Sequence, residues 1–199
     1  LCGVISGVIE KPTDNDAVMR NCLPWQMRDA GLASVYVHGF SPEMFNRQEW
    51  ISRFGFGREL FHPQLRAMGL PDCGGPFRGT CDPSVAAWIG DQLAADPGHR
   101  HFFYWLTLNS HLPVDPDREA SNALGCGKAS FAIKDDAACN LVALVVRVER
   151  AVSELAMRPG LPQTEFVIVG DHAPPFIFKK RRQLFSQYEV PYIHLTPRH

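Results

Sequence analysis

A carboxylate and an imidazole stand side by side at Asp171 and His172, directly after the apolar run of residues 166–169. Carboxylate oxygen and imidazole nitrogen are suitable ligands for Zn²⁺ or Mn²⁺. The run has the length and β-branched content of a buried strand, and open α/β sheets bind ligands at the carboxyl ends of their strands. The sequence therefore predicts a metal-binding pair, with a purely structural Asp-His pair as the alternative. Two ligands alone do not complete a metal site.

Two further histidines follow apolar runs that resemble strands. His38 closes residues 32–38, and His111 follows residues 101–109. A single histidine at a strand end is more often structural than catalytic. However, parallel strands bring their carboxyl ends to one crevice, so we expect His38, His111 and the Asp171-His172 pair at one edge of one sheet.

Motifs of other catalytic centres are not found. The chain has no G-x-S-x-G elbow and no P-loop. Ser110 and His111 are adjacent, but neighbouring residues of a strand point to opposite faces and cannot act as a pair.

The elements that must position these residues alternate between helix and strand. Helices are predicted for residues 23–30, closed by Gly31, for residues 41–53, opened by Ser41-Pro42, and for residues 82–95, opened by Asp82-Pro83. The longest predicted helix, residues 135–157, has one apolar face formed by Leu141, Leu144, Val145, Val148, Val152 and Leu155. Residues 190–197 predict a further strand and residues 117–130 a long loop. The fold class is α/β, with a mostly parallel sheet flanked by helices on both faces.

Size and composition fit one globular domain. The 199 residues are 45% hydrophobic and 21% charged, and a formal net charge of -1 gives no reason to expect a nucleic-acid partner. No apolar run approaches the ~20 residues of a membrane span. The chain begins at Leu1 within an apolar stretch, so we expect a fragment whose upstream part, including any anchor, is missing.

Six cysteines form an even set without C-x-x-C spacing. Cys73 and Cys81 bracket one short segment, and Cys126 and Cys139 bracket another. Local disulfides in an oxidising compartment are one interpretation. Buried free thiols in a cytosolic protein are the other.

Several segments together resemble a known family. LPWQMRDAGLASVYVHGFSPEMFNRQEW (residues 23–50) is similar to the extracytoplasmic phosphotransferases of the alkaline phosphatase superfamily, in which an LP-x-x-L-x-x-x-G-Y helix, an HG strand end and an F-W-N-R motif follow in this order. RGTCDPSVAAW resembles their G-x-x-D helix start, FYWLTLNSHLPV their F-x-x-x-x-T-x-x-x-H-x-P strand, and VIVGDHAPPF their GDH metal strand. The match spans residues 23–176. The group includes lipoteichoic acid synthases, phosphoglycerol transferases and lipid A phosphoethanolamine transferases, so the resemblance implies an alkaline phosphatase-like fold.

The resemblance also implies roles for individual residues. Asp171 and His172 would bind one catalytic divalent metal ion, zinc or manganese, with magnesium as a further option. His111 would contact the transferred phospho-group, and Arg47 would clamp a phosphate through its planar guanidinium.

The remaining substrate-site residues implied by the resemblance are Phe45, Asn46 and His38. Phe45 stands where the lipoteichoic acid synthases have tryptophan, which predicts an altered headgroup pocket.

The nucleophile of the family is a threonine, and a further acidic ligand lies on its first strand. Thr13 is the only threonine before the first predicted helix, and KPTDND predicts a turn. We therefore expect the nucleophile before Leu1, so that residues 1–199 form a domain fragment lacking the first strand and the nucleophile segment, inactive alone.

The predicted function is transfer of a phosphoglycerol or phosphoethanolamine headgroup from a phospholipid donor to a glycan or lipid acceptor through a phospho-threonine intermediate. The enzyme would be held at the cell membrane by the missing N-terminal segment, with its catalytic domain facing the periplasm or exterior. Alternatives are a phosphodiesterase or sulfatase-type hydrolase of the superfamily, or a non-catalytic binding domain. Cys2 is not followed by the Pro-x-Arg of sulfatase nucleophiles. The KKRR run of residues 179–182 predicts either a solvated loop or a contact with anionic lipid headgroups.

Overall fold

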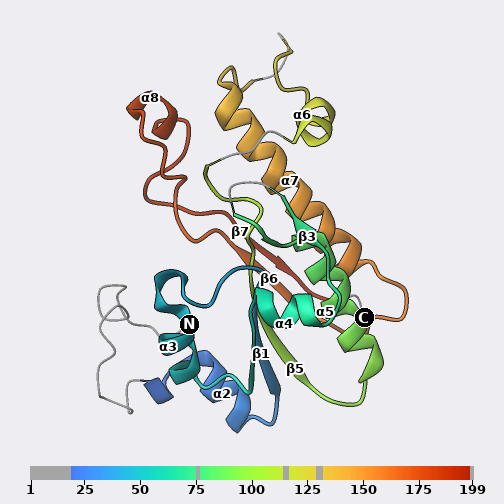
Figure 1. The fold of residues 1–199 in the computed structure, drawn as a ribbon. Coiled ribbons are helices and arrows are strands. Elements are labelled where there is room, and N and C mark those ends of the chain that lie inside the picture. Colours follow the sequence, from blue (N-terminus) through green and yellow to red (C-terminus); the bar gives the residue numbers. More distant parts are fainter. Residues whose placement is uncertain (1–18, 75–76, 114–116, 129–131, 198–199) are drawn as a thin grey trace. The chain divides into compact units, whose positions relative to one another are not determined.

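A computed structural model describes residues 19–74, 77–113, 117–128 and 132–197 (Figure 1). The chain forms two compact units. The first comprises Leu1–Cys73 and Arg78–Leu108, and the second comprises Gly74–Phe77 and Asn109–His199.

The first unit is built on a parallel sheet in the order β2-β1-β5. Its strands are β1 (Ala33–His38), β2 (Arg58–Leu60) and β5 (His101–Leu106). In the central strand, Val37 pairs with Leu60 on one side and with Trp105 on the other. All but the first residue of β1 are buried. This sheet confirms the predicted α/β class.

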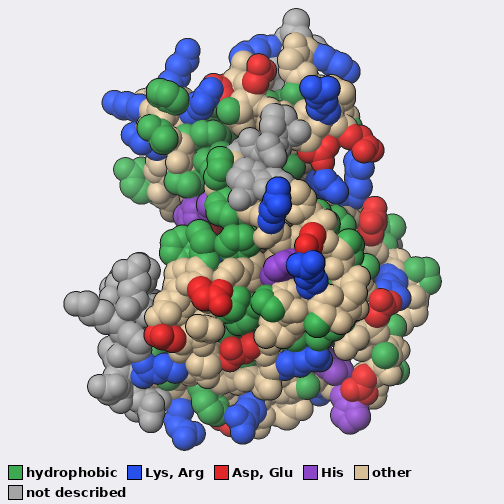
Figure 2. Space-filling view, viewed as in Figure 1, with side chains coloured by type: hydrophobic (Ala, Val, Ile, Leu, Met, Phe, Trp, Pro, Cys, Tyr) green, Lys and Arg blue, Asp and Glu red, His purple; other side chains and the backbone are tan. Residues whose placement is uncertain are grey.

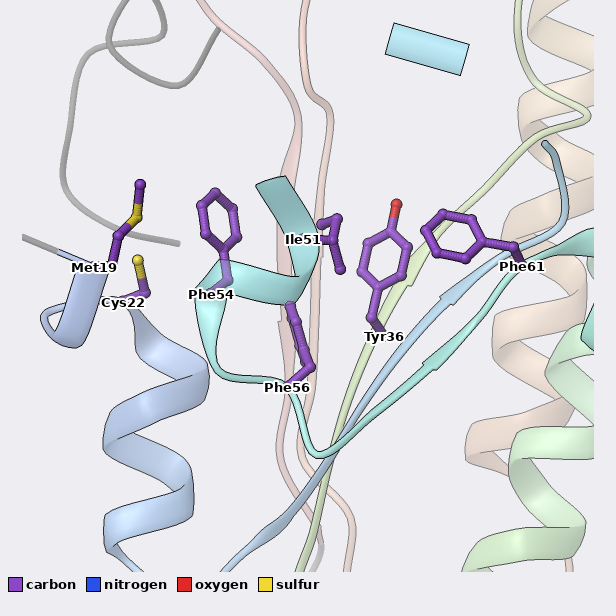
Figure 3. Close-up of a cluster of buried hydrophobic side chains, with 7 residues drawn as sticks. All are labelled: Met19, Cys22, Tyr36, Ile51, Phe54, Phe56 and Phe61. Carbon is purple, nitrogen blue, oxygen red and sulfur yellow. The ribbon is translucent and has the colours of Figure 1, made fainter. Parts of the chain in front are cut away.

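Helices cover both faces of this sheet. On one face, α2 (Leu23–Asp29), α3 (Arg47–Ile51) and the 3-10 turn η3 (Ser52–Phe54) enclose a cluster around Tyr36. Figure 3 shows this cluster: Met19, Cys22, Tyr36, Ile51, Phe54, Phe56 and Phe61. On the other face lies α5 (Asp82–Ala95), whose Trp88 ring meets Phe103 edge-on at 6.1 Å between centroids. Each large apolar side chain buried in this way stabilises the fold by about 1.5–3 kcal/mol.

The helix predicted for residues 41–53 is wrong in its first half. Two short pieces, η2 (Met44–Asn46) and α3, meet where Phe45 and Asn46 both adopt left-handed backbone conformations, with φ of 54° and 55°. The Ser41 hydroxyl accepts a hydrogen bond from the Glu43 amide, 3.2 Å away, and so closes a local turn instead of capping a helix.

The turn after β1 has room only for glycine at position 39. A Cβ atom on Gly39 would lie 2.6 Å from the carbonyl oxygen of Thr80, because the strand β4 (Gly79–Thr80) passes directly against it. β4 pairs with β3 (Asp72–Cys73), and a disulfide between Cys73 and Cys81 closes this hairpin, which favours the local-disulfide interpretation over free thiols. The short elements α4 (His62–Ala67), β3 and β4 were not predicted from the sequence.

The second unit contains α6 (Arg118–Leu124), α7 (Asp136–Ala156), β6 (Phe166–Val169), α8 (Lys179–Arg182) and β7 (Tyr192–Leu195). The loop predicted for residues 117–130 in fact holds α6, because Asp117 caps its first turn by accepting a hydrogen bond from the Ala120 amide at 3.0 Å. The predicted long helix is confirmed as α7, and four residues of its apolar face are buried: Leu141, Leu144, Val152 and Leu155. A second disulfide, Cys126–Cys139, joins α7 to the segment after α6.

β6 differs from its prediction in burial and in partner. It pairs antiparallel with β7, with Phe166 opposite Leu195, in a sheet of two strands. Because one face of this sheet is open, Val167 and Val169 are 59% and 58% exposed. β6 is therefore not a buried strand of the parallel sheet, and the expected meeting of three strand ends at one edge of that sheet is wrong.

None of the helices in the described residues combines the length and the apolar character required to span a bilayer.

Candidate metal and phosphate site

The Asp171-His172 pair lies in the second unit, just after β6. His172 Nδ1 donates a hydrogen bond to the Ala173 carbonyl oxygen at 2.8 Å, which leaves the lone pair on Nε2. Asp171 Oδ1 accepts a hydrogen bond from the His172 amide at 2.9 Å, and Oδ2 lies 3.4 Å from His172 Nε2. Two atoms each about 2.0–2.1 Å from a tetrahedral zinc ion are separated by about this distance. Both side chains are largely exposed, so the pair fits a cation reached from solvent.

His111 lies beside this pair. The ring centroids of His111 and His172 are 6.4 Å apart, with the rings nearly perpendicular. His111 Nδ1 donates to the Leu112 carbonyl oxygen, so its Nε2 is also the available nitrogen. The ring of Phe77 packs edge-on against His111 at 5.1 Å between centroids. The closeness of His111 to the pair is as expected, although β5 ends at Leu106 and His111 lies in the following loop instead of at the strand end.

The pair has no third protein ligand in the described part of the chain. No group of three or more His, Cys, Asp and Glu side chains among those residues is placed to hold a metal ion. Zinc in catalytic sites takes three protein ligands and an exchangeable one. Asp171 and His172 thus present two of the three side chains that such a site needs, and His111 lies beside them.

His38 lies in the first unit, at the end of β1. It is 3% exposed, and its Nδ1 donates to the Leu106 carbonyl oxygen at 2.9 Å. The pKa of His38 is lowered to about 4, chiefly by burial; the hydrogen bond to the Leu106 carbonyl opposes this shift, and the Arg47 charge adds to it. His38 is therefore neutral at pH 7, with its lone pair on Nε2.

The buried imidazole of His38 predicts a pH-dependent stability. The unfolded chain binds a proton on His38 near pH 6.5, whereas the folded chain does so only near pH 4. The free energy of unfolding should therefore fall as the pH drops from 6.5 to 4, by up to about 3 kcal/mol. Urea unfolding across this window should show a flatter dependence for His38→Gln than for the unaltered chain. If the free energy of unfolding depended on pH equally in both proteins, the titration of His38 would not be the cause of that dependence.

Phe45, Asn46 and Arg47 form one corner of the first unit. The Arg47 guanidinium carbon lies 4.9 Å from the centroid of the Phe45 ring, which is 69% exposed. Arg47 Nη1 also donates to the Met44 carbonyl oxygen at 3.3 Å. Two consecutive non-glycine residues at positive φ are strained, and such strain is concentrated at functional corners of proteins. The left-handed pair fixes the direction in which the Phe45 and Arg47 side chains leave this corner.

The strain at Phe45 has a measurable cost. Phe45→Gly and Phe45→Ala both remove the ring and its contact with Arg47, but only glycine adopts the observed φ of 54° freely. We expect the glycine variant to be more stable than the alanine variant by about 1 kcal/mol. Chemical unfolding of the two variants measures this difference. Equal stabilities would mean that the left-handed conformation is not retained.

Comparison with known proteins identifies the family of this chain. A sulfatase family profile matches residues 6–199, nearly the whole chain. The chain belongs to the sulfatase family. No curated protein matches it by sequence.

Solved structures share the fold of this sulfatase-family chain. The lipoteichoic acid synthase LtaP of Listeria monocytogenes superposes with a TM-score of 0.62 at 12% identity, over 86% of this chain and 45% of that one. An alkaline phosphatase superfamily protein of Vibrio parahaemolyticus gives 0.61 at 12% identity, over 94% and 44%. The Streptococcus pyogenes phosphoglycerol transferase GacH, solved with sn-glycerol-1-phosphate, gives 0.59 at 19% identity, over 83% and 44%. These likenesses show the fold, and the chain spans less than half the length of these proteins.

Sequence reasoning missed two contacts of this sulfatase-family chain. Phe77 lies more than thirty residues before His111 in sequence, and no pattern links them. Asp82 was predicted only as a helix start. It is the first residue of α5, and its carboxylate is fully buried. Both carboxylate oxygens accept a hydrogen bond from the Leu108 amide, whose nitrogen lies 3.0 Å from each of them.

Proposed function

We propose that this chain is part of a metal-dependent transferase that moves a phosphoglycerol headgroup from a phospholipid to a cell-envelope acceptor. The observation that carries the proposal is the grouping of Asp171, His172 and His111 within the second unit. The fold shared with a lipoteichoic acid synthase and a phosphoglycerol transferase supports this choice of chemistry. So does the metal dependence that is typical of the superfamily.

The proposed roles follow from the available atoms. Asp171 Oδ2 and His172 Nε2 would hold the cation, and their hydrogen bonds to the backbone fix their orientation. A bound divalent cation polarises a phosphoryl oxygen and lowers the pKa of an attacking hydroxyl. His111 Nε2 would contact a non-bridging oxygen of the phospho-group, and Arg47 would contact a phosphate.

The nucleophile in this proposal is a threonine contributed from before Leu1, as the resemblance implies. Its hydroxyl oxygen would form a bond to phosphorus while the bond from phosphorus to the diacylglycerol oxygen breaks, and diacylglycerol leaves with the proton. An acceptor hydroxyl would then displace the threonine and release it for another cycle. The disulfides at Cys73–Cys81 and Cys126–Cys139 suit the oxidising side of a membrane, where this acceptor would lie.

The headgroup is assigned to phosphoglycerol because of the Phe45-Asn46-Arg47 segment. It resembles the F-W-N-R motif of the phosphoglycerol branch. The cysteine spacing, in contrast, favours the phosphoethanolamine branch. Vesicles of phosphatidylglycerol and of phosphatidylethanolamine, each labelled in the headgroup, should distinguish the two by the rate of diacylglycerol release.

The experiment that tests the proposal follows the labelled headgroup. The protein expressed with the sequence encoded before Leu1 should release diacylglycerol from phosphatidylglycerol only with Zn²⁺ or Mn²⁺ present, and the label should reach an added glycan acceptor. Release of free glycerol phosphate at the same rate with and without the acceptor would instead identify a phosphodiesterase. No reaction and no bound metal would identify a non-catalytic binding domain.

A further inference from the structure

The segment around α8 presents apolar and basic side chains together. Ile177 is 87% exposed, Phe178 65% and Leu184 52%. Lys179 and Lys180, in α8 itself, are exposed beside them. Figure 2 shows lysine and arginine side chains gathered around hydrophobic ones at this place, the upper left of the view. We name these five residues the α8 surface.

The backbone behind the α8 surface is held in place by buried contacts. Phe176 is 6% exposed and packs with Ala138 and Leu141 of α7. Its ring also stacks on Phe185 at 5.9 Å between centroids. The outward position of Ile177 and Phe178 is therefore set by the packing of their neighbours and does not result from a loose end.

Two arginines strengthen this support. Arg181 Nε donates to both oxygens of Asp135, at 3.0 and 2.8 Å, and its guanidinium lies 5.5 Å from the Phe178 ring centroid. Arg182 Nη1 donates to the carbonyl oxygens of Phe176 and Ile177, both at 3.2 Å. The exposed apolar residues are thus fixed on a folded platform.

The local charge is strongly positive although the chain as a whole carries -1. Residues 172–188 contain no Asp or Glu, and four basic residues are consecutive in α8. Arg181 is paired with Asp135, whereas Lys179 and Lys180 make no ion pair with other described residues. An anionic partner with an apolar interior would satisfy both the charge and the exposed apolar side chains, and an anionic bilayer has both properties.

We propose that the α8 surface binds the face of an anionic lipid bilayer, with Ile177 and Phe178 inserted at the boundary between headgroups and acyl chains and Lys179 and Lys180 among the headgroup phosphates. Lysine stems can lie along the apolar surface while their ammonium groups stay at the phosphates. This inference does not rest on the proposed function, because a non-catalytic domain with the same surface would bind in the same way.

Vesicle sedimentation of the full chain tests the proposal. Vesicles of phosphatidylglycerol mixed with phosphatidylcholine should bind the chain, and vesicles of phosphatidylcholine alone should bind it far less. At about 1 M salt, where the screening length falls to about 3 Å, binding should decrease. Lys179→Gln with Lys180→Gln should lower the partition coefficient about 30-fold. Ile177→Ser with Phe178→Ser should lower it about tenfold or more.

Matched variants of residues that are not part of the α8 surface control for charge and apolar area. Arg58→Gln with Arg66→Gln removes two exposed basic groups from the first unit, and Met157→Ser removes a side chain that is 79% exposed. Both should bind vesicles like the unaltered chain. Equal binding to both vesicle types would overturn the proposal, and so would unchanged binding by the Lys179 and Lys180 double variant. Retained binding after loss of Ile177 and Phe178 would exclude insertion and overturn it as well.

Discussion

Replacement of Asp171 and His172 by alanine should weaken zinc binding by more than about 100-fold. The loss of a group that only supports a metal ligand already costs 10–100-fold, and this double variant removes both proposed ligands. Calorimetric titration of the chain with Zn²⁺ measures the affinity. Because both side chains are largely exposed, the thermal unfolding of the metal-free protein should change little. Headgroup transfer, where it is measured, should fall by more than about 10³-fold.

A second Asp-His pair provides the control for this titration. Asp96 and His99 are exposed in the first unit and hydrogen-bonded, with 2.5 Å between His99 Nδ1 and Asp96 Oδ1. This bond lowers the pKa of Asp96 and raises that of His99. Asp96→Ala with His99→Ala should leave zinc affinity within about twofold of the unaltered chain. If zinc affinity fell strongly in this variant and not in the Asp171 and His172 variant, the proposed metal site would be wrong.

Asp82→Ala should lower the free energy of unfolding by about 1.5–3 kcal/mol. The carboxylate is fully buried, and both of its oxygens lie 3.0 Å from the Leu108 amide nitrogen. Its removal forfeits a hydrogen bond to a charged group and leaves a buried N–H without an acceptor. Asp82→Asn, which keeps one acceptor oxygen, should lose less. Urea unfolding gives both values.

Asp136 is the matched control for Asp82. Each is the first residue of its helix, but Asp136 at the start of α7 is exposed. Asp136→Ala should cost no more than about 0.5–1 kcal/mol, since only the interaction with the helix dipole is lost. Similar costs for Asp82→Ala and Asp136→Ala would contradict a specific role for the buried carboxylate.

Much of the fold could be predicted because local patterns and tertiary packing agree. The strand at His38, the helix after Asp82 and the long amphipathic helix of residues 135–157 were predicted within a few residues. The two helices have apolar residues at helical spacing, and the strand is a short run of residues buried on both faces. The helix expected from Ser41 failed because Phe45 and Asn46 adopt left-handed conformations that the sequence pattern does not indicate.

The burial of β6 could not be predicted from composition. A run of four apolar residues is compatible with a fully buried parallel strand or with half of a two-stranded antiparallel sheet. The pairing with β7, from a segment more than twenty residues later, decided between them.

The candidate site was predicted in part. The closeness of His111 to His172 was expected, because both follow apolar runs. The reason for this expectation was a shared sheet edge, which is wrong. The contact of Phe77 with His111 could not be predicted, since contacts between distant segments leave no local pattern. The proximity of His111 to His172 is observed, but the roles of all the site residues stay predictions: Asp171, His172, His111, Arg47, Phe45, Asn46 and His38.

Anomalous X-ray scattering from crystals grown with Zn²⁺, recorded at the zinc absorption edge, tests the central claim most directly. The account predicts one strong peak about 2.0–2.2 Å from a carboxylate oxygen of Asp171 and from Nε2 of His172, with the imidazole of His111 next to it. A zinc ion bound elsewhere, with these three side chains free of metal, would contradict it.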